Sequence, residues 1–281
     1  MDGSPATPPP ARPFFLDGGA AARFGLHHPP AGACRGAWLY MHPFAEEMNK
    51  SRRMAFLQAR ALAQGGHAVL QLDLHGCGDS AGDFGDARWA TWRQDVARGL
   101  DWLAQRHGIT PGLWGLRLGA LLALDVAATR DVAGLLLWQP VTSGSQYLTQ
   151  FLRLKVASQL FNDAGTPTGT AALRQALAAG APLEIAGYTL DPGLALPLDA
   201  CDAAQLAAPA CPVHWFEIAA EDGRPLSPAA ARTVQAWRCA GASVTTQVVA
   251  GPSFWATQEI EDCPALLAAT TAAFTASCHA A

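Results

Sequence analysis

An arginine stands at the centre of a glycine-flanked segment whose pattern would otherwise predict a reactive side chain. The segment Gly115-Leu116-Arg117-Leu118-Gly119 follows a short apolar run and precedes a longer one. Glycines in that pattern allow a sharp turn between a strand and a helix, which projects the central side chain above the sheet. A serine there would attack a carbonyl carbon, and the next N–H, that of Leu118, would face the oxyanion. Arg117 stays protonated and has no lone pair to donate, so it is not a nucleophile.

Three further segments resemble landmarks of the α/β-hydrolases. Residues 73–80 resemble the strand-end loop D-x-x-G-x-G-x-S, and residues 40–44 resemble the "HG" segment before the oxyanion loop, with proline in place of glycine. Residues 218–223 resemble the turn that bears the acid of a catalytic triad, where Asp222 is the best match and Glu221 the alternative. The resemblance implies an α/β-hydrolase fold with Arg117 at the nucleophile position.

The histidine that would complete a triad is missing. It should follow the last predicted strand, in residues 249–255, and no histidine occurs there. A Ser–His–Asp route to acyl transfer is therefore unsupported, and we expect a pseudo-triad. Our hypothesis is that Arg117 and Asp222 form a salt bridge or jointly hold a polar ligand. His42, at a strand end, is a candidate acid or base, and a purely structural hydrogen bond is the alternative.

A basic run, residues 49–53, is expected to open a helix, with Asn49 or Ser51 as its cap. Cations at a helix start oppose the helix dipole, so an anion-binding mouth is one interpretation and neutralisation by the preceding glutamates is the other. Trp138, at the carboxyl end of a strand, is expected to line the pocket. The predicted ligand-contacting residues are Glu46, Glu47, Lys50, Arg53, Leu118, Trp138 and Gln139.

The chain as a whole resembles a narrower group, the exosortase A system-associated hydrolase 2 family. The resemblance implies a bacterium that exports exopolysaccharide and sorts proteins by a C-terminal membrane signal (PEP-CTERM). It implies a hydrolase of the ester or thioester type but supplies no established substrate. We expect an anionic or acylated small molecule, or an acyl or glycan intermediate; the alternative is a non-catalytic binding or accessory protein. The matching segments are residues 42–53, 76–85, 115–120, 138–140 and 254–260.

Strand and helix patterns alternate along the chain, which predicts a doubly wound α/β sheet. The rhythm breaks after the fourth predicted strand, so residues 143–211 are expected to form a helical lid insertion. Residues 1–13 are expected to be a loose tail of a single domain spanning 1–281. The six predicted strands are continuous apolar runs typical of parallel strands buried on both faces: 37–42, 68–74, 113–115, 135–139, 213–218 and 244–249.

Composition narrows the classes of partner. A formal net charge of −4 leaves no basic footprint for nucleic acid, and the apolar stretches are too short for a membrane span. Seven cysteines without ligand spacing favour reduced thiols in a cytoplasm over disulfides or a metal site, and no cofactor is expected. Cys77 is the candidate replacement nucleophile near the strand ends, a weak one without an activating histidine. A displaced serine, such as Ser143 or Ser253, is the least favoured alternative. Assembly into a homodimer is left open.

Overall fold

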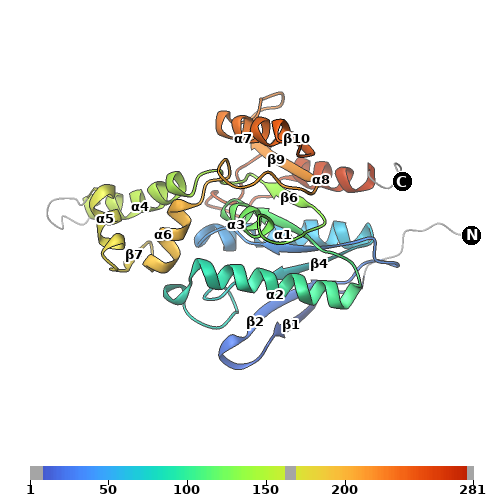
Figure 1. Cartoon of the computed structure of the whole chain (residues 1–281), viewed down its shortest axis with the longest axis horizontal. Helices are drawn as coiled ribbons and strands as arrows, with labels where there is room; N and C mark the ends of the chain where they lie inside the picture. Colours follow the sequence, from blue (N-terminus) through green and yellow to red (C-terminus); the bar gives the residue numbers. More distant parts are fainter. Residues whose placement is uncertain (1–8, 162–168, 277–281) are drawn as a thin grey trace, which may run out of the picture.

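The computed structural model describes residues 9–161 and 169–276, and its main element is an eight-stranded sheet (Figure 1). The strand order is β1-β2-β4-β3-β5-β6-β9-β10, and a separate hairpin pairs β7 with β8. Strands β4, β3, β5, β6, β9 and β10 run parallel, whereas β2 pairs antiparallel with both β1 and β4 at one edge. The strands are β1 (Arg12–Leu16), β2 (Arg23–His28), β3 (Gly36–Met41), β4 (His67–Leu72), β5 (Gly112–Leu116), β6 (Leu135–Trp138), β7 (Leu183–Ile185), β8 (Tyr188–Leu190), β9 (Val213–Ala219) and β10 (Val244–Ala250).

Helices cover both faces of the sheet. The α-helices are α1 (Glu46–Gln64), α2 (Trp89–His107), α3 (Leu118–Ala127), α4 (Gly144–Phe161), α5 (Thr170–Ala178), α6 (Pro192–Ala200), α7 (Pro228–Cys239) and α8 (Pro264–Ala276). Strand β3 shows why both faces need cover, because Trp38 and Tyr40 pack with α1 and α8 while Leu39 and Met41 pack with α2 and α3. The continuous apolar runs of the sequence are therefore buried on two sides, as predicted for parallel strands.

All six predicted strands occur, with boundaries that differ by at most two residues, and the α/β-hydrolase arrangement is confirmed. The predicted loose tail, residues 1–13, overlaps the first strand, because β1 begins at Arg12. Residues 9–11 have no regular secondary structure. Residues 1–8 of that tail lie outside the described part. The edge strands β1 and β2 were not predicted; their pairing with β4 extends the sheet beyond the alternating βα units.

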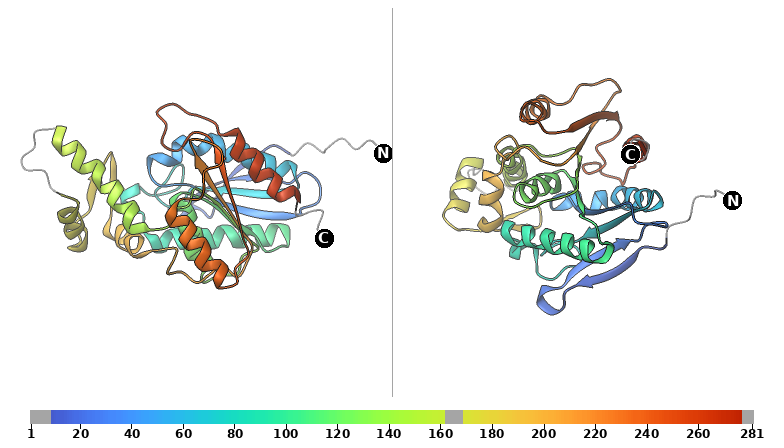
Figure 2. Two further views of the ribbon diagram at one scale, coloured as in Figure 1. Left: turned by 90° about the horizontal axis from the view of Figure 1, so that it is seen from above. Right: turned by 45° about the vertical axis from the view of Figure 1, so that its right-hand side comes forward.

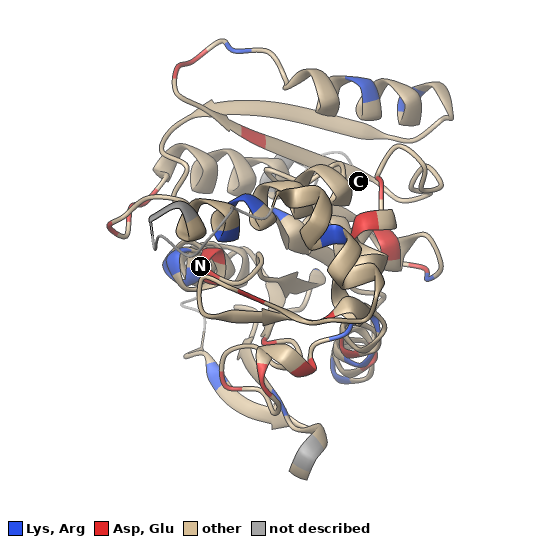
Figure 3. Cartoon of the chain, turned by 90° about the vertical axis from the view of Figure 1, so that its left-hand side faces the viewer, with Lys and Arg blue, Asp and Glu red and all other residues tan. Residues whose placement is uncertain are grey.

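The segment between β6 and β9 gathers at one end of the molecule, where α4 projects away from the sheet (Figures 1 and 2). It holds α4, α5, the β7–β8 hairpin and α6 in place of further sheet strands. This segment corresponds to the predicted insertion at 143–211, and its action as a lid stays a prediction. On the side of the molecule that carries it, acidic and basic residues are intermixed (Figure 3). Within the described ranges, no helix is long and apolar enough to cross a membrane.

Candidate functional site

The turn between β5 and α3 has the strained geometry that the glycine pattern predicts. Arg117 caps α3 with φ 55° and ψ −116°, a backbone conformation that residues other than glycine rarely adopt. A Cβ at Gly115 would run into the backbone of Ala120, and one at Gly119 would run into the carbonyl oxygens of Met41 and His42. Tight contact with α3 and with the end of β3 therefore requires both glycines, and it projects residue 117 from the carboxyl end of the sheet.

The Arg117 side chain is held by three residues from distant parts of the chain. Its Nε and Nη2 lie 3.4 and 3.3 Å from Oε1 of Glu47, in the first turn of α1. Its guanidinium carbon lies 5.7 Å from the ring centre of Tyr147 on α4 and 5.3 Å from that of Trp255, in the loop after β10. Aromatic rings attract a cation at these distances. With its side chain 19% exposed, Arg117 is enclosed by one carboxylate and two rings.

Glu47 is the anionic half of this arrangement. Burial raises the pKa of its carboxyl, and Arg117, the Tyr147 hydroxyl and Lys50 oppose that rise without overcoming it. Burial and the neighbouring carboxylate also raise the pKa of Tyr147 well above its usual value, so its hydroxyl stays protonated. The Glu47 carboxyl is thus a group whose proton affinity depends on the presence of its arginine partner.

A pocket of about 320 Å³ opens beside Arg117, and we call it the elbow pocket. Aromatic and aliphatic side chains form much of its wall, and two ion pairs, Arg117–Glu47 and Lys50–Glu46, supply its charges. Leu154 at its rim is about half exposed. The lining residues are Phe44, Ala45, Glu46, Glu47, Lys50, Arg117, Tyr147, Gln150, Phe151, Leu154, Trp255 and Ala256. The pocket therefore combines apolar surface with two ion pairs whose charges balance.

Arg117 forms its salt bridge with Glu47, and not with Asp222 as expected. Asp222 follows β9, as predicted for the acid turn, but its side chain is exposed in that loop. Glu221 in the same turn lies 3.6 Å from Arg224. Arg117 pairs with Glu47 because α1 begins beside the turn and places its first-turn carboxylate within reach, whereas Asp222 faces solvent.

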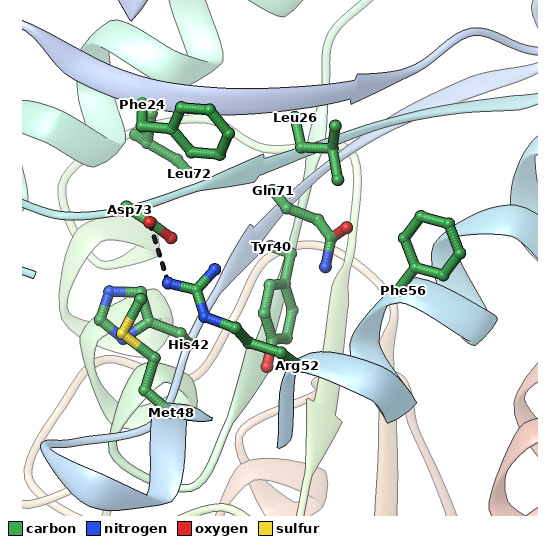
Figure 4. Close-up of a pocket in the computed structure, with 10 residues that line it drawn as sticks. All are labelled: Phe24, Leu26, Tyr40, His42, Met48, Arg52, Phe56, Gln71, Leu72 and Asp73. Atoms are coloured by element: carbon green, nitrogen blue, oxygen red, sulfur yellow. Dashed lines mark hydrogen bonds and ion pairs between the residues drawn. The ribbon is translucent and has the colours of Figure 1, made fainter. Parts of the chain in front are cut away.

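His42 is buried at the end of β3, and both of its ring nitrogens contact the backbone. Its Nδ1 lies 2.8 Å from the Pro43 carbonyl oxygen, and its Nε2 accepts the Leu74 N–H at 3.3 Å. It stands beside Met48 and Asp73 (Figure 4). Burial lowers its pKa, which favours the neutral ring with the proton on Nδ1. Of the two roles considered for His42, this geometry favours the structural hydrogen bond, and a catalytic role stays a prediction.

The helix with the basic run begins earlier than predicted. Its cap is Ala45, with φ 50° and no side-chain hydrogen bond, so neither Asn49 nor Ser51 caps it. Lys50 pairs with Glu46 at 3.3 Å, and the exposed Arg53 pairs with Asp262 at 2.9 Å. Of the two interpretations of this run, the geometry favours neutralisation over an anion-binding mouth, although only Lys50 uses one of the preceding glutamates. Partners already neutralise both cations, and the acidic first turn suits the helix dipole.

Two of the other predicted ligand contacts lie elsewhere. Trp138 is fully buried in the core between sheet and α8, where its Nε1–H donates to Thr270 at 3.0 Å, so it does not line the elbow pocket. The Gln139 side chain accepts the Ile218 N–H at 2.7 Å and thereby ties β6 to β9. The Leu118 side chain is buried, but its N–H belongs to the first turn of α3, where helix donors lack partners within the helix.

Cys77 is unsuited to replace the missing serine. Its side chain is buried, and burial together with the carboxylates of Asp73 and Asp95 raises the pKa of its thiol. The six cysteines in the described part of the chain are free, and Cys278 lies outside it. Among the described residues, no group of three or more histidines, cysteines or carboxylates is arranged to hold a metal ion.

Tyr147 and Trp255 are the site residues that sequence reasoning missed. Trp255 occupies the loop after the last strand, where a histidine is expected, and its ring packs against residue 117. An aromatic residue in that loop, opposite a cation at the turn, is the signal that could have found it. Tyr147 gave no such signal, because its contact depends on how α4 returns over the pocket.

The mostly parallel sheet covered by helices and the sharp turn between β5 and α3 define an α/β-hydrolase fold. Est1E from Butyrivibrio proteoclasticus, solved with ferulic acid, is similar with a TM-score of 0.68 and 15% identity, over 93% of this chain and 96% of that one. A monoglyceride lipase from Saccharomyces cerevisiae is similar with a TM-score of 0.65 and 13% identity, over 94% of both chains. Identities this low establish the fold alone.

A family model described as serine aminopeptidase, S33, matches residues 33–193, more than half of the sequence. The chain therefore belongs to that family of hydrolases. Human protein ABHD12B is 34% identical over 97 residues, which are 34% of this chain. The match spans 25% of the length of the human protein. Family membership sharpens the contrast at Arg117, because the family takes its name from a serine.

Proposed function

We propose that the elbow pocket binds an acylated or otherwise amphipathic small molecule and that the chain forms no acyl-enzyme. The observation that carries the proposal is the position of Arg117, at the nucleophile turn but held by Glu47 and two aromatic rings. The pocket lining, within the described part of the chain, contains no serine, threonine, cysteine or histidine. A covalent intermediate would need one of these or another activated group, so binding is the function that the geometry supports best.

The chemistry of the lining favours a ligand with an apolar chain and a polar head. Phe151 and Leu154 of α4 offer apolar surface, and the Arg117–Glu47 pair, which Tyr147 contacts, supplies charged groups to the same lining. An anionic or carbonyl head that accepts from Arg117 would displace Glu47, and the raised pKa of Glu47 lets that carboxyl take up a proton when displaced. With an anionic head this exchange leaves no unpaired buried charge, whereas with a neutral carbonyl head Glu47 must stay ionised beside Arg117 to balance the cation.

We also infer that this ligand belongs to the exopolysaccharide or exosortase system, as the resemblance of the sequence implies. Three of the segments that carry the resemblance contribute to the elbow pocket: 42–53 supplies Glu47, 115–120 supplies Arg117, and 254–260 supplies Trp255. Deletion of the gene in a bacterium with that system is expected to alter exopolysaccharide export. Unchanged export would contradict this assignment but not the binding function.

Binding can be tested with 1-decanoylglycerol and decanoate by titration calorimetry. Both probes are expected to bind wild type, and Trp255→Ala is expected to weaken binding about tenfold, the effect of about 1.4 kcal/mol of lost contact. Arg224→Met, which removes an exposed arginine on another loop, is the charge control and should bind like wild type. A fluorophosphonate probe should label no serine. Labelling, or equal binding by Trp255→Ala, would refute the proposal.

Catalysis without a protein nucleophile is the second candidate, and the raised pKa of Glu47 is the observation that favours it. Glu47 would accept a proton from water as the water oxygen attacks an ester carbonyl, with the Leu118 N–H facing the oxyanion. Collapse would release an acid and an alcohol, and the alcohol would take the proton back. Hydrolysis of 4-nitrophenyl decanoate that is lost in Glu47→Gln would establish this candidate, whereas binding without hydrolysis supports the first.

A further inference from the structure

A second cavity, of about 190 Å³, lies between α1 and the sheet (Figure 4). We call it the α1 slot; the residues that matter are Leu26, Tyr40, Arg52, Phe56, Gln71 and Asp73. It shares no lining residue with the elbow pocket. The slot exists because α1 sits over β3 and β4, and the neighbouring strand β2 extends the sheet past the edge of the helix.

One wall of the α1 slot offers unused hydrogen-bond donors. Arg52 Nη2 donates to Asp73 Oδ2 at 3.0 Å, an oxygen that also accepts the Asp79 N–H at 3.0 Å. Asp73 is thereby fixed against the loop after β4, and within the described chain the other nitrogens of the Arg52 guanidinium have no protein acceptor. The Gln71 carbonyl oxygen is bonded to His28 at 2.8 Å, which leaves the amide N–H groups directed into the slot (Figure 4). The Tyr40 side chain is part of the same lining.

The remaining walls of the slot are apolar. Phe56 on α1 and Leu26 on β2 face each other across it, and both are only partly buried by the protein. A dry cavity of about 150 Å³ is enough to hold a benzene ring, so this slot accommodates one ring or a short branched chain with a small polar group. Ring or chain would pack between Phe56 and Leu26, and its polar group would meet Arg52 and Gln71.

We propose that the α1 slot is a binding site for a small aromatic or branched aliphatic monocarboxylate, whose carboxylate accepts from Arg52 and Gln71. Donors outnumber free acceptors in the lining, which selects a ligand group that accepts hydrogen bonds. One carboxylate oxygen of Asp73 already accepts hydrogen bonds from Arg52 and from the Asp79 N–H. The negative charge of Asp73 disfavours ligands with more than one negative charge. The site is independent of the elbow pocket and of the function proposed for it.

Three matched probes test the polarity of the slot: phenylacetate, phenylacetamide and phenethylamine. They share the ring and differ in the polar group, and binding can be followed by ligand-observed NMR. Phenylacetate is expected to bind, phenylacetamide more weakly, and phenethylamine not at all. Binding of the amine equal to that of the acid, or no binding by any probe, would overturn the proposal.

Variants locate the bound probe. Gln71→Glu keeps the shape of the side chain but replaces donors with acceptors, so phenylacetate is expected to bind at least about tenfold more weakly. Lys50→Met alters the elbow pocket instead and should leave phenylacetate binding unchanged. Loss in Lys50→Met with retention in Gln71→Glu would place the probe in the elbow pocket and refute the proposal.

A crystal soaked with phenylacetate provides the test that needs no variant. Density for the probe between Arg52 and Gln71 would support the site. Density only in the elbow pocket, or at the molecular surface as an adventitious additive only, would overturn it.

Discussion

Arg117 combines backbone strain with a charge at a single position. Its φ of 55° is tolerated because the flanking glycines fix the turn, and its guanidinium is satisfied by Glu47, Tyr147 and Trp255. A non-glycine residue in such a conformation costs about 1–3 kcal/mol, which the rest of the fold must offset. In an ordinary hydrolase the strain exposes a nucleophile, whereas here it exposes a cation to the pocket.

Replacement of Arg117 can separate strain from charge. Arg117→Ala and Arg117→Gly both remove the ion pair, but glycine relieves the strained backbone, so the glycine variant should be more stable than the alanine variant by about 1 kcal/mol. Urea denaturation at pH 7 measures the difference. An alanine variant as stable as the glycine variant would show that the backbone at this turn is not strained.

Glu47 should leave a signature in the pH dependence of stability. Its pKa is raised in the folded protein, so the folded state binds the proton more tightly than the unfolded chain does. The stability from this group is fully present below the unfolded pKa and is lost as pH rises through the folded pKa. The free energy of unfolding of wild type should therefore fall, relative to Glu47→Gln, as pH rises above about 4.5. Parallel profiles for the two proteins would contradict this expectation.

At the scale of elements, the contact between α3 and the end of β3 is the junction on which the site depends. Gly119 permits it, since any Cβ there meets the carbonyl oxygens of Met41 and His42, which cannot move without displacing β3. Helix α1 then starts from the same strand at Ala45 and brings Glu47 to Arg117. The first turns of α1 and α3 therefore meet at the end of β3, and this brings Glu47 and Arg117 together.

Gly119→Ala should destabilise the protein by about 2 kcal/mol or more, because the added methyl group overpacks against fixed backbone. Gly169→Ala is the matched control, since a Cβ there has no neighbour within 4 Å and its φ of −68° suits alanine. Because Gly169 caps α5 and alanine is a poorer cap than glycine, the control should cost about 1 kcal/mol or less. Similar melting temperatures for the two variants would show that the junction is looser than the structure implies.

At the scale of the whole molecule, the segment between β6 and β9 is joined to the sheet domain by aromatic packing. Phe44 is buried, with ring centres 5.9 and 5.0 Å from those of Tyr147 and Phe151 on α4. Its other side packs edge-on against Phe84 and Trp92. Phe44 therefore connects the strand end, the pocket wall and the helix proposed to act as a lid.

Phe44→Ala should loosen α4 more than the sheet. The loss of a buried phenylalanine costs about 3–5 kcal/mol, and the contacts with Tyr147 and Phe151 disappear with it. Hydrogen exchange is expected to speed up in α4 while β5 stays protected. Phe15→Ala, at a side chain that is 58% exposed, is the control and should leave exchange unchanged. Equal acceleration in α4 and β5 would mean that Phe44 stabilises the molecule globally and does not anchor α4.

Local sequence patterns determined much of this protein. Apolar runs of strand length gave six parallel strands, and the glycines around Arg117 gave the turn, because both depend on residues close together in the chain. The absence of a serine at the turn and of a histidine after the last strand is likewise legible in the sequence. These residues alone predict a pseudo-triad, with an arginine at the turn in place of the nucleophile.

Only the tertiary structure decided what surrounds that cation. Glu47 is 70 residues from Arg117 in sequence, and Trp255 reaches it from the loop after β10. Trp138 looked like a pocket residue from its place at a strand end, yet α8 covers it and turns it into core. The partner of Arg117 depends on which elements converge in three dimensions: α1 starts earlier than predicted and brings Glu47 to Arg117, whereas the loop with Asp222 faces solvent. The sequence specifies the charge at the turn, and the packing specifies its carboxylate and its rings.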